Sequence, residues 1–111
     1  MQIQEQQHGA VTVVKPLGAL AGEDAETFKS RTEAVLGRSM GRVVIDASGI
    51  PYTDSRGLEV LVEISDALAE GGQVLRLCGA TETLREALDL TELSGLFEHY
   101  EDVGTGVRSF L

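Results

Sequence analysis

The sequence has a single cysteine, Cys78, in 111 residues. One cysteine excludes a disulfide within the chain and a zinc site built on cysteines. Because Val74, Leu75 and Leu77 precede it, we expect Cys78 to be a small buried apolar residue and not a reactive thiol.

Basic residues are also scarce. Nine lysines and arginines stand against eighteen acidic residues, which gives a net charge of −9. This balance argues against binding to nucleic acid or to an anionic membrane surface, because both would repel the chain. It is compatible with a protein partner that has a basic docking surface.

Long hydrophobic runs are missing. No apolar stretch approaches the roughly 18 residues of a membrane span, and Met1–His8 has neither the basic start nor the apolar core of a signal peptide. We therefore expect a cytoplasmic protein. The length and the 42% hydrophobic content fit one domain over residues 1–111.

Hydrophobic periodicity predicts strands that alternate with helices. Extended segments are predicted at residues 3–5, 11–17, 42–46, 74–78 and 96–100, with a hairpin turn at His8-Gly9. Helices are predicted from Glu23 to just before Gly37, from Ser55 to about Glu70, from Glu82 to Leu90 after a Thr81 cap, and over residues 103–111. The fold class is therefore α/β: a mixed sheet that opens with a β-hairpin and packs against about four helices.

The stretch Asp54-Ser55-Arg56-Gly57 begins the second predicted helix and has two interpretations. In one, Thr53, Asp54 or Ser55 is simply the N-cap. In the other, Ser55 is phosphorylated at the positive end of the helix. Arg56 could then supply a compensating cation, and Gly57 would let another protein approach the backbone.

The same helix has three faces at 100° per residue. Its core face contains Gly57, Val60, Leu61, Ile64 and Leu68, and its solvated face contains Glu59, Glu63, Asp66 and Glu70. A stripe between them, formed by Leu58, Val62, Ser65 and Ala69, lies on the flank of Ser55. This stripe either widens the core contact or forms an exposed strip for another protein.

Catalytic patterns are weak. His8 and His99 lie in no triad motif, and no loop resembles a phosphate cradle. We expect no enzymatic activity, cofactor or metal. A small nucleotide-binding or hydrolytic enzyme is the least favoured alternative.

Two motifs carry a resemblance to a known family. "VVIDASGIPYTDSRGLEVL" and "LREALDLTELSGLFEHYED", in this order of elements, resemble the STAS domain family, specifically the stand-alone anti-sigma factor antagonists of bacteria. The resemblance covers nearly the whole chain and implies a non-enzymatic regulator of transcription.

The resemblance also implies partners and a site. An anti-sigma factor serine kinase with a histidine-kinase-like ATPase fold would phosphorylate Ser55. The unphosphorylated form would sequester that kinase, and a PP2C-type phosphatase would reverse the modification. Asp54 and Gly57 take the motif positions beside Ser55. Leu58, Val62 and Glu59 are expected on the docking surface.

The chain departs from the family pattern at two positions. Arg56 stands where the family has serine or threonine. Ala21 stands where it tends to have an acid, a role that Glu23 or Asp24 could take. The alternative function is therefore a STAS scaffold that is not phosphorylated and docks on a transporter ATPase or in a multi-protein signalling complex.

Overall fold

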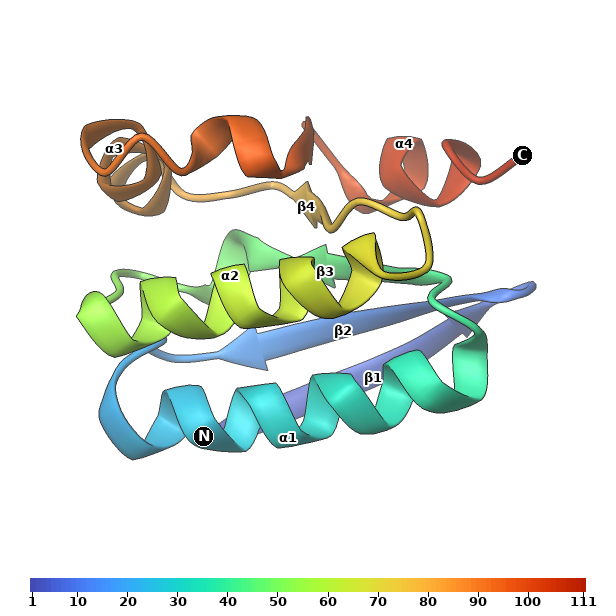
Figure 1. Cartoon of the computed structure of the whole chain (residues 1–111), viewed down its shortest axis with the longest axis horizontal. Coiled ribbons are helices and arrows are strands. Elements are labelled where there is room, and N and C mark those ends of the chain that lie inside the picture. Colours follow the sequence, from blue (N-terminus) through green and yellow to red (C-terminus); the bar gives the residue numbers. More distant parts are fainter.

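Five strands form one mixed sheet, in the order β1-β2-β3-β4-β5, in the computed structural model, which describes residues 1–111 (Figure 1). The strands are β1 (Gln2–His8), β2 (Val11–Leu17), β3 (Val43–Asp46), β4 (Arg76–Cys78) and β5 (Glu98–Tyr100). β1 pairs antiparallel with β2, and the pairings along β2, β3, β4 and β5 are parallel. The predicted mixed α/β sheet and its opening hairpin are confirmed.

Four α-helices pack on this sheet. They are α1 (Gly22–Ser39), α2 (Ser55–Ala69), α3 (Glu82–Leu90) and α4 (Val103–Arg108), and two short 3-10 turns are η1 (Ala47–Gly49) and η2 (Ser94–Leu96). In Figure 1, α1 and α2 run side by side along one face of the sheet. No helix has the length and apolar character to cross a membrane.

The alternation of side chains along the buried strands produces two cores. On β3, Val43 and Ile45 join the main core with apolar residues of α1, α2 and α3, whereas Val44 points to the opposite face. There Val44 and Cys78 pack against α4. Cys78 is fully buried, as predicted, and burial raises the pKa of its thiol to about 12. Helices therefore cover both faces of the parallel part of the sheet.

Most predicted elements are present, but some boundaries were wrong. α1 does not end before Gly37: it continues to Ser39, and Met40 in a left-handed conformation closes it. β4 begins at Arg76, so the predicted start at Val74 was too early. β1 is longer than residues 3–5 because all of Gln2–His8 pairs with β2. The Thr81 cap of α3 is confirmed, since its hydroxyl oxygen accepts from the Leu84 amide at 3.3 Å.

Candidate functional site

The first turns of α1 and α2 lie beside each other because the loops that lead into them are bonded together. Leu20 and Thr53 form a parallel bridge beyond the ends of the named strands. The Leu20 amide donates to the Tyr52 carbonyl at 3.0 Å, and the Thr53 hydroxyl donates to the Leu20 carbonyl at 2.7 Å. The pairing of β2 with β3 thus fixes the N-termini of α1 and α2 next to each other, beyond the carboxyl ends of these two strands.

Asp54 connects these two N-termini with one carboxylate. Its Oδ1 accepts from the Gly57 amide of α2 at 2.8 Å, and its Oδ2 accepts from the Gly22 amide of α1 at 3.0 Å. A negative charge is favourable there because the helix dipoles point their positive ends at it. The bond from Gly57 is the largest cause that lowers the pKa of Asp54, and the bond from Gly22 adds to it. Asp54, and not Thr53 or Ser55, is therefore the N-cap of α2.

Ser55 is the first residue of α2 and is exposed. Because Asp54 already caps the helix, the Ser55 hydroxyl is not needed as a cap and makes no hydrogen bond within the chain. By contrast, the neighbouring Thr53 hydroxyl is bonded to the Leu20 carbonyl. Ser55 thus presents a free hydroxyl at the start of α2.

Gly57 has a different role from the one predicted. It is buried, and a Cβ atom there would lie 2.0 Å from the Leu20 carbonyl oxygen and 2.1 Å from the Thr53 hydroxyl oxygen. The prediction that Gly57 lets another protein approach the backbone was wrong, because the close neighbour is the chain's own loop. Gly57 instead allows the two loops to bond.

Arg56 points its guanidinium into a network of acids between α1 and α2. It donates to Glu26 of α1, and on α2 to Glu63 at 2.6 Å and Glu59 at 3.3 Å. Lys29 of α1 contacts the second oxygen of Glu63 at 3.1 Å. Arg56 thus ties α1 to α2, and its charge is already compensated by three carboxylates.

Hydrogen bonds within the network shift the pKa values of Arg56, Glu26 and Glu63. Hydrogen bonds from Arg56 are the largest cause that lowers the pKa of both Glu26 and Glu63. Those two carboxylates in turn raise the pKa of Arg56, with Glu26 the larger cause. All these groups are therefore charged at neutral pH.

A shallow apolar hollow lies on the flank of α2. It has a volume of about 360 Å³ and is lined by Leu58, Glu59, Val62, Glu63 and Leu93, and we call it the α2 hollow. Leu58 is half-buried and also packs against the main core, whereas Val62 is half-buried in the wall of the hollow. The hollow combines an apolar floor with two carboxylates.

Burial differs along the stripe on α2, so the stripe does not belong wholly to the core. Ser65 is buried and Ala69 is exposed, so the stripe is not one uniform surface. The five residues assigned to the core face, Gly57, Val60, Leu61, Ile64 and Leu68, are all buried as predicted. Of the stripe, only Leu58 and Val62 line the α2 hollow, and both lie in the N-terminal part of α2.

Sequence reasoning missed several residues of this site. Glu26, Lys29 and Leu93 come from α1 and from the segment after α3, and only the folded chain brings them to α2. Glu23 and Asp24 were expected to take the role of an acid at the position of Ala21, but neither contacts Ser55. Asp24 instead accepts from the Met1 amino group at 3.0 Å. No group of three or more potential metal ligands comes together.

Comparison with known proteins gives one family. The family model described as STAS domain matches residues 2–106. No curated protein matches the chain significantly.

Solved structures share the fold at low identity. A protein of Thermotoga maritima is 21% identical with a TM-score of 0.87, over 96% of this chain and 92% of that one. An anti-sigma factor antagonist from Mycobacterium paratuberculosis is 22% identical with a TM-score of 0.83, over 97% and 92%.

The anti-sigma factor antagonist SpoIIAA matches in two states. Its unphosphorylated form is 13% identical with a TM-score of 0.77, over 98% of this chain and 96% of that one. The Bacillus protein in its phosphorylated form is 12% identical with a TM-score of 0.72, over 99% and 100%.

Proposed function

Because the chain belongs to the STAS domain family, we propose that it is an anti-sigma factor antagonist, a binding module that is switched off by phosphorylation of Ser55. In the unphosphorylated state it sequesters an anti-sigma serine kinase with a histidine-kinase-like ATPase fold. A PP2C-type phosphatase restores this state. The observation that carries the proposal is the exposed, unbonded Ser55 hydroxyl beside the α2 hollow.

Phosphate on Ser55 would find no free cation on its own helix. Arg56 is held by Glu26, Glu59 and Glu63, and the adjacent Asp54 carboxylate repels a second negative charge. The amide groups of the α2 N-terminus offer some compensation, worth about 0.3–1 kcal/mol for an exposed anion. The phosphate therefore stays at the surface of a domain that keeps its fold.

The effect of that phosphate is larger at an interface. A dianion that is enclosed against an unmatched partner surface costs several kcal/mol, and a penalty of about 4 kcal/mol weakens binding roughly a thousandfold. Phosphorylation thus acts by blocking docking and not by unfolding the chain. SpoIIAA supports this mechanism, because both its unphosphorylated and its phosphorylated forms match the present fold.

The α2 hollow is the proposed docking surface. Its apolar floor at Leu58 and Val62 suits an apolar side chain of the partner, and Glu59 at its edge suits a basic one. Asp54 and Gly57 support Ser55 indirectly, since they fix the turn that presents it.

The test uses a candidate partner, an ATPase of the histidine-kinase-like fold from the same organism. The two purified proteins are incubated with ATP, phosphate is mapped by mass spectrometry, and binding is measured before and after transfer. We expect phosphate on Ser55 and a large loss of affinity. Ser55→Ala should bind without being modified, and Ser48→Ala is the matched control, because Ser48 is exposed but donates to Asp46 at 2.7 Å.

If Ser55 carried no phosphate after incubation with the ATPase and ATP, and the ATPase stayed bound, the switch would be contradicted. This result would favour the alternative of a scaffold that docks without phosphorylation. Co-purification with a transporter ATPase or with a larger signalling complex would identify which scaffold it is.

A further inference from the structure

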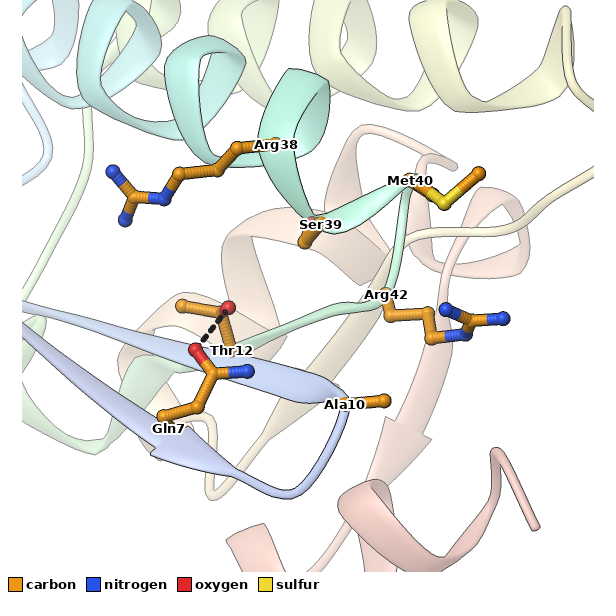
Figure 2. Close-up of a pocket in the computed structure, with 7 residues that line it drawn as sticks. All are labelled: Gln7, Ala10, Thr12, Arg38, Ser39, Met40 and Arg42. Carbon is orange, nitrogen blue, oxygen red and sulfur yellow. Dashed lines mark hydrogen bonds between the residues drawn. The ribbon is translucent and has the colours of Figure 1, made fainter.

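A second pocket lies at the opposite end of α1 from Ser55. It has a volume of about 310 Å³ and is formed where the C-terminus of α1 meets the β1-β2 hairpin (Figure 2). At 1.5 Å per residue, the 18 residues of α1 separate the two sites by about 27 Å. Nothing in the proposed phosphorylation switch uses this pocket.

The charge of the pocket is opposite to that of the molecule. Its lining includes Arg38 and Arg42 and no acidic residue, in a chain whose net charge is −9. Arg38 shares the single carboxylate of Glu5 with Arg31, so two cations face one anion beside the pocket. Arg42 is exposed and pairs with no carboxylate. A local excess of positive charge therefore remains.

One part of this arrangement has a simpler explanation. A basic residue in the last turn of a helix complements the negative end of its dipole, and this accounts for Arg38. It does not account for Arg42, which lies beyond the end of α1 and just before β3. Nor does it account for the polar floor of the pocket.

The lining of the pocket includes an unpaired hydroxyl. Ser39 Oγ is shielded from solvent and has no hydrogen-bond partner. Figure 2 shows Ser39 above Thr12, which is buried and donates to Gln7 Oε1 at 2.9 Å, while Gln7 Nε2 donates to the Gly9 carbonyl at 2.9 Å. Thr12 and Gln7 thus hold each other in place, and Ser39 alone is left without a partner. Unpaired buried hydroxyls are rare in proteins, and a ligand oxygen is one way to satisfy them.

We propose that this pocket binds a small oxyanion, a phosphate or carboxylate group of a low-molecular-weight ligand. Arg38 and Arg42 lie on either side of the pocket in Figure 2, with their guanidinium groups directed away from each other. Arg42 is exposed and unpaired, so it can turn towards an anion between them, whereas Arg38 would have to leave Glu5, which Arg31 also contacts. Guanidinium groups match the geometry of phosphate and carboxylate oxygens. A rotation of the Ser39 side chain would let its shielded hydroxyl donate a hydrogen bond to the same anion.

The test titrates the full chain, labelled with nitrogen-15, with inorganic phosphate and separately with citrate, while sodium chloride at equal ionic strength serves as the reference. We expect saturable shifts of the backbone amide signals of residues 38–42 and 10–12 with at least one of the two anions, and the preferred anion distinguishes a phosphate from a carboxylate ligand. Arg42→Gln and Ser39→Ala should each weaken binding at least fivefold. Arg85→Gln should not, because Arg85 is an exposed arginine of α3 outside the pocket.

Several results would overturn the proposal. These are shifts that do not saturate, shifts that sodium chloride reproduces, or equal effects of Arg42→Gln and Arg85→Gln. Loss of binding in Arg42→Gln but not in Ser39→Ala would mean that the anion binds to surface charge alone. It would contradict a binding pocket that includes Ser39. None of these results bears on phosphorylation of Ser55, so the two proposals fail separately.

Discussion

At the scale of single residues, the site depends on how closely two loops approach each other. Gly57 has no side chain, and this absence lets the start of α2 contact the Leu20 carbonyl. The Asp54 carboxylate then accepts hydrogen bonds from the N-terminal amides of both helices. The exposed Ser55 hydroxyl makes no hydrogen bond within the chain, because Asp54 caps the helix and Gly57 allows the loops to pack.

Two glycines in helices should respond to alanine in opposite ways. Gly57→Ala gains helix propensity of about 0.8–1 kcal/mol, but its methyl group would lie 2.0 Å from the Leu20 carbonyl oxygen. We expect a net loss of stability of about 1–3 kcal/mol, as for other overpacked sites. Gly37→Ala in α1 meets nothing within 4 Å and should stabilise the domain by about 0.5–1 kcal/mol. Urea unfolding of both variants measures the difference. Equal effects would mean that the loops separate easily.

Asp54 predicts a dependence of stability on pH. Its folded pKa is lowered, above all by the Gly57 amide. A group with a lowered folded pKa stabilises the domain above its unfolded pKa, and this contribution is lost as the pH falls through the folded value. The free energy of unfolding should therefore decrease below about pH 4. Asp54→Asn should be less stable at neutral pH and lose less on acidification.

The control for that measurement is Asp66→Asn. Asp66 is an exposed residue on the solvated face of α2 and makes no side-chain hydrogen bond to a helix N-terminus. Its substitution should leave the pH profile of unfolding close to that of the original chain. If Asp54→Asn and Asp66→Asn had the same profile, Asp54 would not be the connecting cap.

At the scale of elements, α2 has one face in the core and one flank that carries the proposed docking surface. Leu61 is 1% exposed in the main core, so Leu61→Ala should cost about 2–5 kcal/mol. Val62, one residue later, lines the α2 hollow. Val62→Glu should weaken binding of the partner ATPase strongly and change the urea midpoint little. Ala34→Glu, on an exposed position of α1, is the matched control.

Leu58 will not separate binding from stability in this way. It lines the hollow and also packs against the main core. Leu58→Glu should therefore reduce both the affinity for the partner and the free energy of unfolding. A large stability loss in Val62→Glu as well would show that the whole flank belongs to the core.

The elements that could be predicted from the sequence are those with a local signal. The core face of α2 follows from its helical period, and all five of its predicted residues are buried. The end of α1 could not be read in the same way, because Gly37 is tolerated inside the helix and Met40, a residue with no turn preference, closes it.

Contacts between distant segments left no pattern in the sequence. Arg56 could be placed on α2, but Glu26 lies 30 residues away and meets it only because β2 and β3 pair in parallel. Gly57 was misread for the same reason, since its neighbour Leu20 belongs to another loop. The position of Ser55 could be predicted, whereas its surroundings needed the fold.

At the scale of the whole molecule, the net negative charge of the chain influences how a phosphate on Ser55 would change its stability. Phosphorylation of Ser55 changes the net charge from −9 to about −11. The favourable helix end and the unfavourable overall charge oppose each other, so stability should change by less than about 1 kcal/mol. For a domain of this size that corresponds to a shift of the melting temperature within about 5 °C.

The measurement compares thermal unfolding of the enzymatically phosphorylated chain with that of the unmodified chain, at low and at high salt. High salt should reduce the difference in melting temperature between the two forms, because the charges involved are exposed. The same phosphorylated sample should bind the partner ATPase about a thousandfold more weakly. A fall of the melting temperature by 15 °C or more, roughly three times the expected limit, would mean that the phosphate acts by loosening α2 from α1. In that case the partner would recognise a change of shape, and the local repulsion proposed here would be the wrong mechanism.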